Sequence, residues 1–468
     1  MIRAIIAGAL LFASTISTRL WPLSWLAAYL VFQTLLNQNF SARIRRLGIS
    51  QIIYFGLLLH WTSIYVGSLP WLTLTLLESV LIAVVGVFSF KRNTESALLF
   101  ALLWSSADFV RMKFPFGGFG WGRIGFFHID SPLRPLLAIG GVTLITFVVV
   151  FTSSLSNVRT TSAKISLLVV FTIVFASYIY QYSFDKQSKN SQSIKVAAVQ
   201  GGVNLGLDFN RTPEEVFSLH LNETQKNLQS LSHSAFVLWP ENSVDVDPFV
   251  HENLMHQLNS LMEKINSPLL VGAVLDDNGL RNASLFITPD GISRYYKRDL
   301  APFGEYIPLR SLAQQLSPYA ADVTDFRSGE KGALFNAGGA KVAPLICFEV
   351  LDDQFVSAST RSASILAIQT NNATFGRSSE AIQQFLINRV RAYEMRKPAV
   401  IASTTGFSAV LNDKGEVVSS IKQFQPGVAI AKIQPQPRVT LRAQFPYASE
   451  IVILVLLAFV LLRRKLSR

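Results

Sequence analysis

The sequence predicts a multi-pass helical membrane bundle joined to one α/β domain, and three observations carry this prediction. Half of the residues are apolar and only 15% are charged, whereas a soluble globular protein carries about 25% charged residues. The apolar residues are dense from residue 1 to about 182, ordinary from about 193 to 433, and dense again to the end. In the middle stretch, short apolar runs alternate with segments rich in helix formers. We therefore expect a bundle of about seven helices over 1–182, a folded domain over 193–433, and a last span with a basic tail over 445–468.

Eight apolar segments are candidates for membrane-spanning helices, although several are shorter than the ~20 residues that a span needs. They cover residues 4–18, 23–38, 51–66, 70–89, 96–110, 135–152, 164–182 and 445–462. Tryptophan and tyrosine residues lie near the segment ends, as interfacial anchors do. A cleaved signal peptide over 1–18 is the alternative for the first segment, but no clear small-residue cleavage site precedes Arg19.

The formal charge of +12 suggests nucleic-acid binding at first, but the basic residues are scattered along short loops beside the apolar segments. If all eight segments cross, the loops on one side carry Arg3, Arg43, Arg45, Arg46, Lys91, Arg92, Arg159, Lys164, Arg463, Arg464, Lys465 and Arg468. The short loops on the other side carry only Arg19, Arg111, Lys113, Arg123 and Arg134. Because cytoplasmic loops are enriched in Lys and Arg, this bias places residues 183–444 on the extracytoplasmic face. The positive charge of the chain then sets its orientation in the membrane, and no nucleic acid is expected as a partner.

Ionisable residues in or beside the apolar segments include Glu78, Asp108 and Arg111. Ionisable groups in a membrane are functional candidates by default. Asp108 and Arg111 are three residues apart, however, so on a helix they can form an ion pair. We favour this structural interpretation.

The sequence pattern of the folded domain predicts alternating strands and helices. Strands are expected at 193–200, 235–239, 269–275, 341–347 and 364–369, and helices at 213–232, 249–265 and 378–396. A hairpin over 283–296 turns at Pro289-Asp-Gly291, and paired strands over 399–418 are joined by Asn412-Asp-Lys-Gly415. This order predicts an α/β domain with a mostly buried sheet.

Three reactive side chains follow predicted strands. Glu241 stands two residues after the strand that ends at Trp239, Lys297 follows the hairpin, and Cys347, the single cysteine of the chain, ends the apolar run that begins near Lys341. In an open α/β sheet, groups just past the strand ends can converge on one crevice.

The chemistry of this trio is coherent. A cysteine nucleophile needs a base or a nearby positive charge, because its thiol is only a few per cent ionised at neutral pH. Glu241 can take the thiol proton, and Lys297 can stabilise the thiolate and then an oxyanion. Taken alone, a lone cysteine after an apolar strand is more often an inert small hydrophobe. The joint placement of the three residues favours a catalytic site.

The motifs that carry these residues resemble those of a known family. Trp239-Pro-Glu241, Lys297 with Pro302-Phe-Gly-Glu305, and Leu345-Ile-Cys-Phe-Glu349 are similar to the Glu-Lys-Cys regions of the nitrilase superfamily. In the membrane half, 106–111 and 114–122 are similar to segments of the bacterial apolipoprotein N-acyltransferase family, and so are 369–371 and 391–394. With apolar spans on both sides, the whole chain looks like a member of that family.

The resemblance implies a nitrilase-like α-β-β-α sandwich on the outer face of an eight-helix bundle in the bacterial cytoplasmic (inner) membrane. It also implies transfer of a fatty acyl chain from a phospholipid to the α-amine of the diacylglyceryl-modified N-terminal cysteine of an apolipoprotein, through a thioester. Glu241 would be the base, Lys297 the oxyanion stabiliser and Cys347 the acylated nucleophile. The supporting or substrate-binding positions would be Glu305, Glu349, Phe348, Phe209 and Trp239.

Two departures from the family pattern concern aromatic residues. Phe348 stands where tyrosine often follows the cysteine, and Phe209 where tryptophan is often found. A membrane-anchored amidohydrolase of the same superfamily is the alternative, although an anchor needs only one span. A transporter or binding protein with an inactive outer domain is disfavoured by the intact trio. No cofactor is expected, because an acyl ester carries its own activation, and no His/Cys cluster has the spacing of metal ligands.

Overall fold

The computed structural model describes residues 1–65, 67–187, 192–206, 212–316 and 323–466. The chain forms two compact units. The first comprises Met1–Ser63, Gly67–Gln187 and Gln444–Arg468, and the second comprises Ile64–Val66 and Ser188–Ala443. Phe209 lies outside the described residues.

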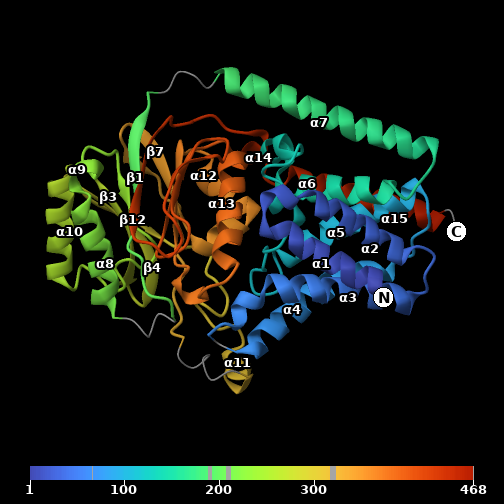
Figure 1. The fold of residues 1–468 in the computed structure, drawn as a ribbon, viewed down its shortest axis with the longest axis horizontal. Helices are drawn as coiled ribbons and strands as arrows, with labels where there is room; N and C mark the ends of the chain where they lie inside the picture. Colours follow the sequence, from blue (N-terminus) through green and yellow to red (C-terminus); the bar gives the residue numbers. More distant parts are fainter. Residues whose placement is uncertain (66, 188–191, 207–211, 317–322, 467–468) are drawn as a thin grey trace. The chain divides into compact units, whose positions relative to one another are not determined.

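The first unit is helical (Figure 1). Its main helices are α1 (Ile2–Ile16), α2 (Pro22–Leu35), α3 (Phe40–Leu58), α4 (Ser68–Ala83), α5 (Thr94–Arg111), α6 (Leu137–Leu155), α7 (Thr161–Gln187) and α15 (Ala448–Leu466). Within the described residues, three helical stretches are long and apolar enough to cross a membrane: Ser68–Val87, Arg134–Leu155 and Thr161–Lys186. The helices α1 and α2 are apolar but shorter. This composition is that of a membrane protein.

The helix expected at 51–66 begins and ends earlier, as α3. The Asn39 side chain accepts a hydrogen bond from the Ala42 N–H at 2.9 Å, which fixes the first turn of α3 well before the apolar run. Arg43 therefore lies in the helix and not in a loop. Its buried guanidinium donates to the Gly86 carbonyl at 2.9 Å and the Val87 carbonyl at 3.1 Å. The polar start of α3 is thus explained by helix capping.

The buried ionisable residues of the first unit pair with one another. The Arg111 guanidinium lies 2.8 Å from Asp108 Oδ1 and 2.8 Å from Glu78 Oε2, and its side chain is fully buried. It also donates to the Trp121 carbonyl at 2.7 Å. Arg111 therefore connects α4, α5 and the following loop, which supports the structural interpretation of the Asp108–Arg111 pair.

The second unit contains two six-stranded sheets. The first sheet has the order β12-β1-β2-β3-β4-β5 and consists of β1 (Ile194–Gln200), β2 (Val237–Leu238), β3 (Leu269–Asp276), β4 (Leu280–Thr288), β5 (Gly291–Tyr296) and β12 (Gly427–Ile433). The second sheet has the order β11-β10-β9-β8-β7-β6 and consists of β6 (Phe335–Ala337), β7 (Ala340–Ile346), β8 (Ile365–Thr370), β9 (Ala399–Ser403), β10 (Ala409–Leu411) and β11 (Val417–Ser420).

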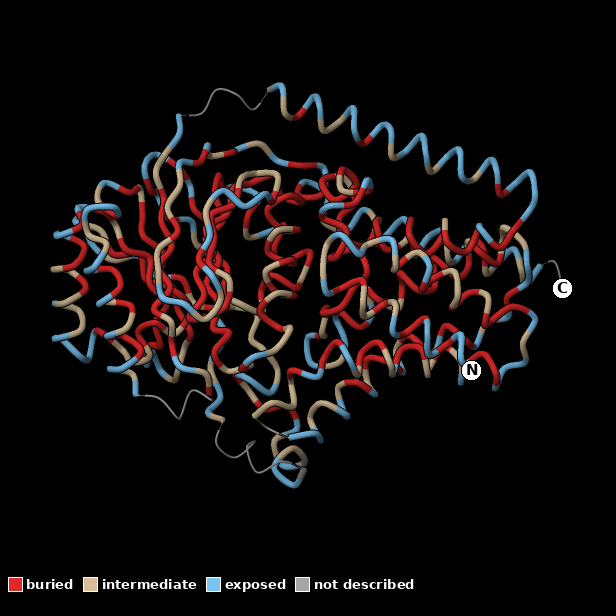
Figure 2. The backbone as a smooth tube through the Cα atoms, in the orientation of Figure 1, coloured by how far each residue is buried: buried red, intermediate tan, exposed pale blue. Residues whose placement is uncertain are grey.

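The sheets stack face to face with helices outside. A core that includes Val196, Leu238, Val342 and Ala367 joins the inner faces of the two sheets. A second core joins the first sheet to its outer helices through Phe217 and other apolar residues. The helices are α8 (Pro213–Lys226), α9 (Leu228–Leu231) and α10 (Glu252–Ile265) on the first sheet, α12 (Asp353–Thr360) and α13 (Glu380–Met395) on the second, and the short α11 (Arg310–Leu316) and α14 (Leu441–Gln444). Figure 1 shows these layers and Figure 2 the burial of the central strands, which confirms the α-β-β-α sandwich.

The carboxyl ends of the parallel strands lie at one end of the sandwich. In the first sheet β1, β2 and β3 are parallel, and in the second β7, β8 and β9 are parallel. Chain segments that leave these strands therefore meet at the same end of the sandwich. Pro240-Glu241 follows β2, Cys347 follows β7, and Asn371 follows β8.

Gly272 in β3 allows the close approach of the segment after β2. A Cβ atom at this position would lie 2.3 Å from the Pro240 carbonyl oxygen and 2.7 Å from Glu241 Cα. We expect Gly272→Ala to shift Glu241 and to destabilise the domain by about 1–3 kcal/mol, as overpacking against backbone does. A thermal or denaturant melt of the purified protein measures this change. Gly332→Ala is the control, because its Cβ would meet only the Arg298 guanidinium at 3.7 Å; equal melts for both variants would contradict the prediction.

Candidate active site

The structure brings Glu241, Lys297 and Cys347 together from three strand ends. Lys297 follows β5 directly, and its Nζ lies 2.9 Å from Glu241 Oε1. Both side chains are buried, with exposed fractions of 2% and 5%. Cys347 is partly exposed as a residue, and its thiol lies near enough to Glu241 and Lys297 for both charges to act on it. The three residues therefore form one cluster.

Glu305 and Asn282 complete the ionic part of this cluster. The ammonium of Lys297 lies 2.8 Å from Glu305 Oε2. The Asn282 amide donates to Glu241 Oε1 at 2.8 Å and to Glu305 Oε1 at 2.9 Å. One amide and one ammonium thus hold two carboxyl groups side by side. Asn282 was not predicted from the sequence, because the partners of its amide lie 41 and 23 residues away in the chain.

The ionisation of the cluster follows from burial and from its opposite charges. Burial raises the pKa of Glu241, and the Lys297 ammonium opposes this shift. Burial disfavours the charge of Lys297, but Glu241 and Glu305 outweigh it and hold the pKa of Lys297 well above its ordinary value. Lys297 is therefore an ammonium at neutral pH. A carboxylate with a raised pKa is a stronger base, which suits Glu241 for proton abstraction.

Cys347 stands at a sharp turn between β7 and a short 3-10 helix (Cys347–Leu351). Its φ of +48° is left-handed, a conformation that costs a non-glycine residue about 1–2 kcal/mol. Desolvation and the charge of Glu241 raise the pKa of the thiol well above its ordinary value, and Lys297 opposes this shift. At rest the group is a neutral thiol.

Comparison with known proteins identifies the family. Residues 7–155 match the family model of the apolipoprotein N-acyltransferase N-terminal domain, and residues 195–442 match that of the carbon-nitrogen hydrolases. An apolipoprotein N-acyltransferase of Mycolicibacterium smegmatis is 30% identical over 419 residues, covering 80% of this chain and 70% of its own. The chain belongs to the apolipoprotein N-acyltransferase family.

Other relatives span nearly the full length of the chain. The apolipoprotein N-acyltransferase of Azotobacter vinelandii is 27% identical over 501 residues, covering 99% of this chain and 95% of its own. A solved amidase of the nitrilase superfamily from Nesterenkonia is 15% identical, covers 53% of this chain and 92% of its own, and superimposes with a TM-score of 0.40.

Glu349, a supporting residue by family resemblance, joins the segments that carry Lys297 and Cys347. Its Oε1 accepts hydrogen bonds from the Tyr295 hydroxyl at 2.6 Å and from the Arg298 N–H at 2.8 Å. Its Oε2 accepts from the Ile346 N–H at 2.8 Å. In the part of the chain that the structure describes, Glu349 has no hydrogen bond to Glu241 or to the sulfur, so its place in this apolipoprotein N-acyltransferase fold is to hold the two segments together.

Among the aromatic residues named as supporting positions, Trp239 and Phe348 differ in their burial. Trp239 is fully buried, packs on Phe217, and donates from its indole to Thr224 Oγ1 at 3.0 Å. It supports the strand before Glu241 and offers no open surface to a substrate. Phe348 is partly exposed beside Cys347, and Phe209 lies outside the described residues.

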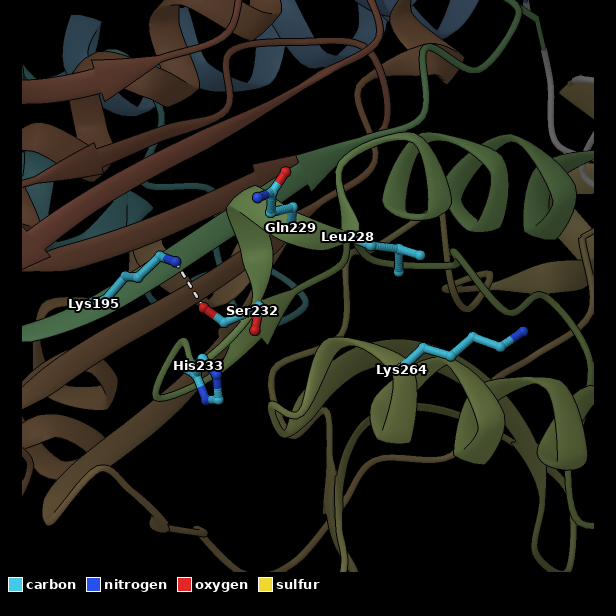
Figure 3. Close-up of a pocket in the computed structure, with 6 residues that line it drawn as sticks. All are labelled: Lys195, Leu228, Gln229, Ser232, His233 and Lys264. Carbon is cyan, nitrogen blue, oxygen red and sulfur yellow. Dashed lines mark hydrogen bonds between the residues drawn. The ribbon is translucent and has the colours of Figure 1, made fainter.

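A separate surface hollow of about 690 Å³ lies at the amino ends of the parallel strands of the first sheet (Figure 3). It is lined by Lys195, Leu228, Gln229, Ser232, His233 and Lys264. These residues stand at the start of β1, around α9 and at the end of α10, near the amino ends of the parallel strands. Glu241 and Cys347 follow the carboxyl ends, so the hollow is not part of the candidate site.

We expect loss of the Asn282 amide to change the pH at which Cys347 reacts. In Asn282→Leu the Glu241 carboxyl group loses a donor that favours its charged form, so the pKa of Glu241 rises further. Glu241 must be ionised to act as base, so the alkylation rate of Cys347 by iodoacetamide falls as the pH is lowered. In the variant, the pH at which this fall occurs should be higher by about 0.5–1 unit. Mass spectrometry of the alkylated protein across pH measures the shift.

Asn253→Leu, at an exposed position of α10, is the matched control for this experiment. The role assigned to Asn282 would be wrong if both leucine variants kept the wild-type pH profile.

Proposed function

We propose that this protein transfers a fatty acyl chain from a membrane phospholipid to the α-amine of the N-terminal S-diacylglyceryl-cysteine of apolipoproteins. The observation that carries the proposal is the buried Glu241–Lys297 ion pair beside the single cysteine, in a chain that matches the family over both halves. The substrates are the phospholipid donor and the apolipoprotein acceptor, and the bilayer is the environment that holds both.

In the first half-reaction the thiol of Cys347 loses its proton to Glu241, and the sulfur attacks the carbonyl carbon of the phospholipid ester. The negative charge that develops on the carbonyl oxygen is stabilised by the Lys297 ammonium. The tetrahedral intermediate then breaks its bond to the glycerol oxygen. Glu241 returns the proton to that oxygen, so a neutral thioester and a lysophospholipid result.

In the second half-reaction the neutral α-amine of the apolipoprotein attacks the thioester carbon. Glu241 takes a proton from the attacking nitrogen, and Lys297 again faces the oxyanion. The carbon–sulfur bond breaks, an amide remains on the lipoprotein, and the sulfur regains a proton. The two halves use the same three side chains in the same positions.

A membrane-anchored amidohydrolase acting on small amides would use the same trio, with water in place of the amine. The match of residues 7–155 to the acyltransferase N-terminal domain favours the acyltransferase. A lipid donor also explains a bundle, because extracting a phospholipid into water exposes its chains at about 0.8 kcal/mol per methylene. An inactive binding domain would have no use for a buried base beside a thiol.

We expect purified enzyme that meets phospholipid without acceptor to gain the mass of one acyl chain on Cys347. Cys347→Ala should gain none, and Glu241→Gln should form the thioester at least about 100-fold more slowly, since the base is lost while the shape remains. Intact-protein mass spectrometry measures the product. Glu252→Gln at the exposed start of α10 is the control. Normal lipoprotein modification by Cys347→Ala would rule out the mechanism.

The arrangement in the membrane is part of the proposal. We propose that 1–182 and 445–468 form the eight-span bundle in the cytoplasmic membrane and that 193–433 form the catalytic domain on the extracytoplasmic face. The bias of Lys and Arg toward one set of loops supports this orientation.

The single cysteine makes the orientation easy to test. In a Cys347→Ala background without other cysteines, we expect Asp277→Cys to react with a membrane-impermeant maleimide in spheroplasts. Arg92→Cys should react only after the membrane is opened. Both positions are exposed in the structure. The reverse labelling pattern would contradict the orientation.

A further inference from the structure

Besides Glu241 and Lys297, the side chain of Gln384 lies near the sulfur of Cys347. Gln384 belongs to α13, one of the helices outside the second sheet. Gln384, in the second turn of α13, places its amide Nε2 3.4 Å from Cys347 Sγ. The side chain is buried. An amide nitrogen carries two N–H donors and no acceptor, so the contact is an N–H···S hydrogen bond.

The direction of the Gln384 amide is fixed by Asn372. Gln384 Oε1 accepts a hydrogen bond from Asn372 Nδ2 at 2.7 Å, which leaves Nε2 to face the sulfur. Asn372 uses both of its donors, because Nδ2 also donates to Glu380 Oε2 at 2.8 Å. Its Oδ1 accepts from the Thr370 hydroxyl at 3.0 Å and from the Ser403 hydroxyl at 2.5 Å. Every hydrogen-bonding site of the Asn372 side chain is therefore occupied.

Glu380 and Gln384 each supply an acceptor oxygen to the Asn372 amide. If the Asn372 amide turned over, its oxygen would face the Gln384 amide oxygen, which cannot donate a hydrogen bond. Glu380 is 1% exposed at the first turn of α13. The space around Asn372 also excludes movement, because a Cβ on Gly406 would lie 2.3 Å from Asn372 Oδ1. Glu380, Asn372 and Gln384 thus form one chain of hydrogen bonds that ends on sulfur.

We propose that Gln384 is a further catalytic residue, whose amide N–H stabilises the Cys347 thiolate, and that Asn372 and Glu380 are positioning residues that aim this amide. The inference rests on the proposed role of Cys347 as nucleophile. A donor at this place favours the thiolate over the thiol. It therefore assists the sulfur both as it attacks the ester and as it leaves the thioester.

The charged groups that act on the sulfur are Glu241, Lys297 and Glu380. Burial, Glu241 and Glu380 raise the pKa of Cys347, while the Lys297 ammonium and the Gln384 hydrogen bond lower it. Burial raises the pKa of Glu380 to about 8, so this carboxyl is mostly uncharged at neutral pH. It can accept from Asn372 there without adding a full negative charge beside the thiolate.

The test is the rate of Cys347 alkylation by iodoacetamide across pH, with a melt of each variant. We expect Gln384→Met, which keeps the length but removes the donor, to lower the rate at neutral pH about tenfold and to raise the apparent pKa of the thiol by about one unit. Gln383→Met is the matched control on the same helix, since the Gln383 amide donates to Ser379 Oγ at 2.9 Å. It should keep the wild-type profile.

A pair of variants at Glu380 tests the positioning role. Glu380→Gln keeps an acceptor for Asn372 and should stay within about twofold of wild type at pH 7. Glu380→Leu removes the acceptor and should lose several-fold in rate. Above pH 8 the wild-type carboxyl ionises and opposes thiolate formation, so Glu380→Gln should react faster than wild type there.

The outcomes separate this inference from the proposed function. Wild-type alkylation by a folded Gln384→Met, or equal loss in Glu380→Gln and Glu380→Leu, would overturn it while the acylation of Cys347 by phospholipid still stood. If Gln384→Met does not fold, the Glu380 pair decides. Absence of acylation on wild-type Cys347 would instead overturn the proposed function.

Discussion

The buried ammonium of Lys297 between the carboxyl groups of Glu241 and Glu305 is the interaction on which the rest of the site depends. A buried charge without a partner costs several kcal/mol, and a paired one is tolerated only with good geometry and additional hydrogen bonds. Here the distances are 2.9 and 2.8 Å, and the Asn282 amide bridges the two carboxyl groups. The fold must therefore hold the ends of β2, β4 and β5 in register with one another, because loss of Lys297 would leave two buried carboxyl groups without an opposite charge.

The end of β8 and the residues that follow it connect this cluster to Cys347. Gln369 Nε2 donates to the Trp239 carbonyl at 2.8 Å, just before Glu241, and the Asn371 N–H donates to Glu241 Oε2 at 3.0 Å. The next residue, Asn372, directs Gln384 toward Cys347. Gln369 and Asn371 thus hold the segment that carries Glu241, and Asn372 holds the Gln384 amide that faces the sulfur of Cys347. Because β8 belongs to the second sheet and Glu241 follows the first, these bonds also lock the two sheets together.

Much of this arrangement could be predicted from the sequence. The apolar runs and their flanks identify most elements of the domain, and the strand ends identify Glu241, Lys297 and Cys347. The short β6 and the edge strand β12 were not predicted, because β6 has three residues and β12 pairs with β1, more than 200 positions away in the chain. Asn282, Asn372 and Gln384 were missed for the same reason. Each is an ordinary polar residue until a distant segment supplies its partner, and one chain carries no local signal of that partner.

In the mechanism that we propose, the arrangement of charges allows Cys347 to act as a nucleophile in a buried site. Moving a proton from the Cys347 thiol to Glu241 leaves the net charge of the cluster unchanged, since the negative charge passes from a carboxylate to a sulfur that also faces Lys297. The raised pKa of Glu241 favours the proton there, and the donor from Gln384 favours the charge on sulfur. Formation of the thioester then neutralises the sulfur, and the proton on Glu241 leaves with the alcohol. At no stage does the buried site gain or lose a whole charge, so neither half-reaction has to overcome the desolvation of a new ion.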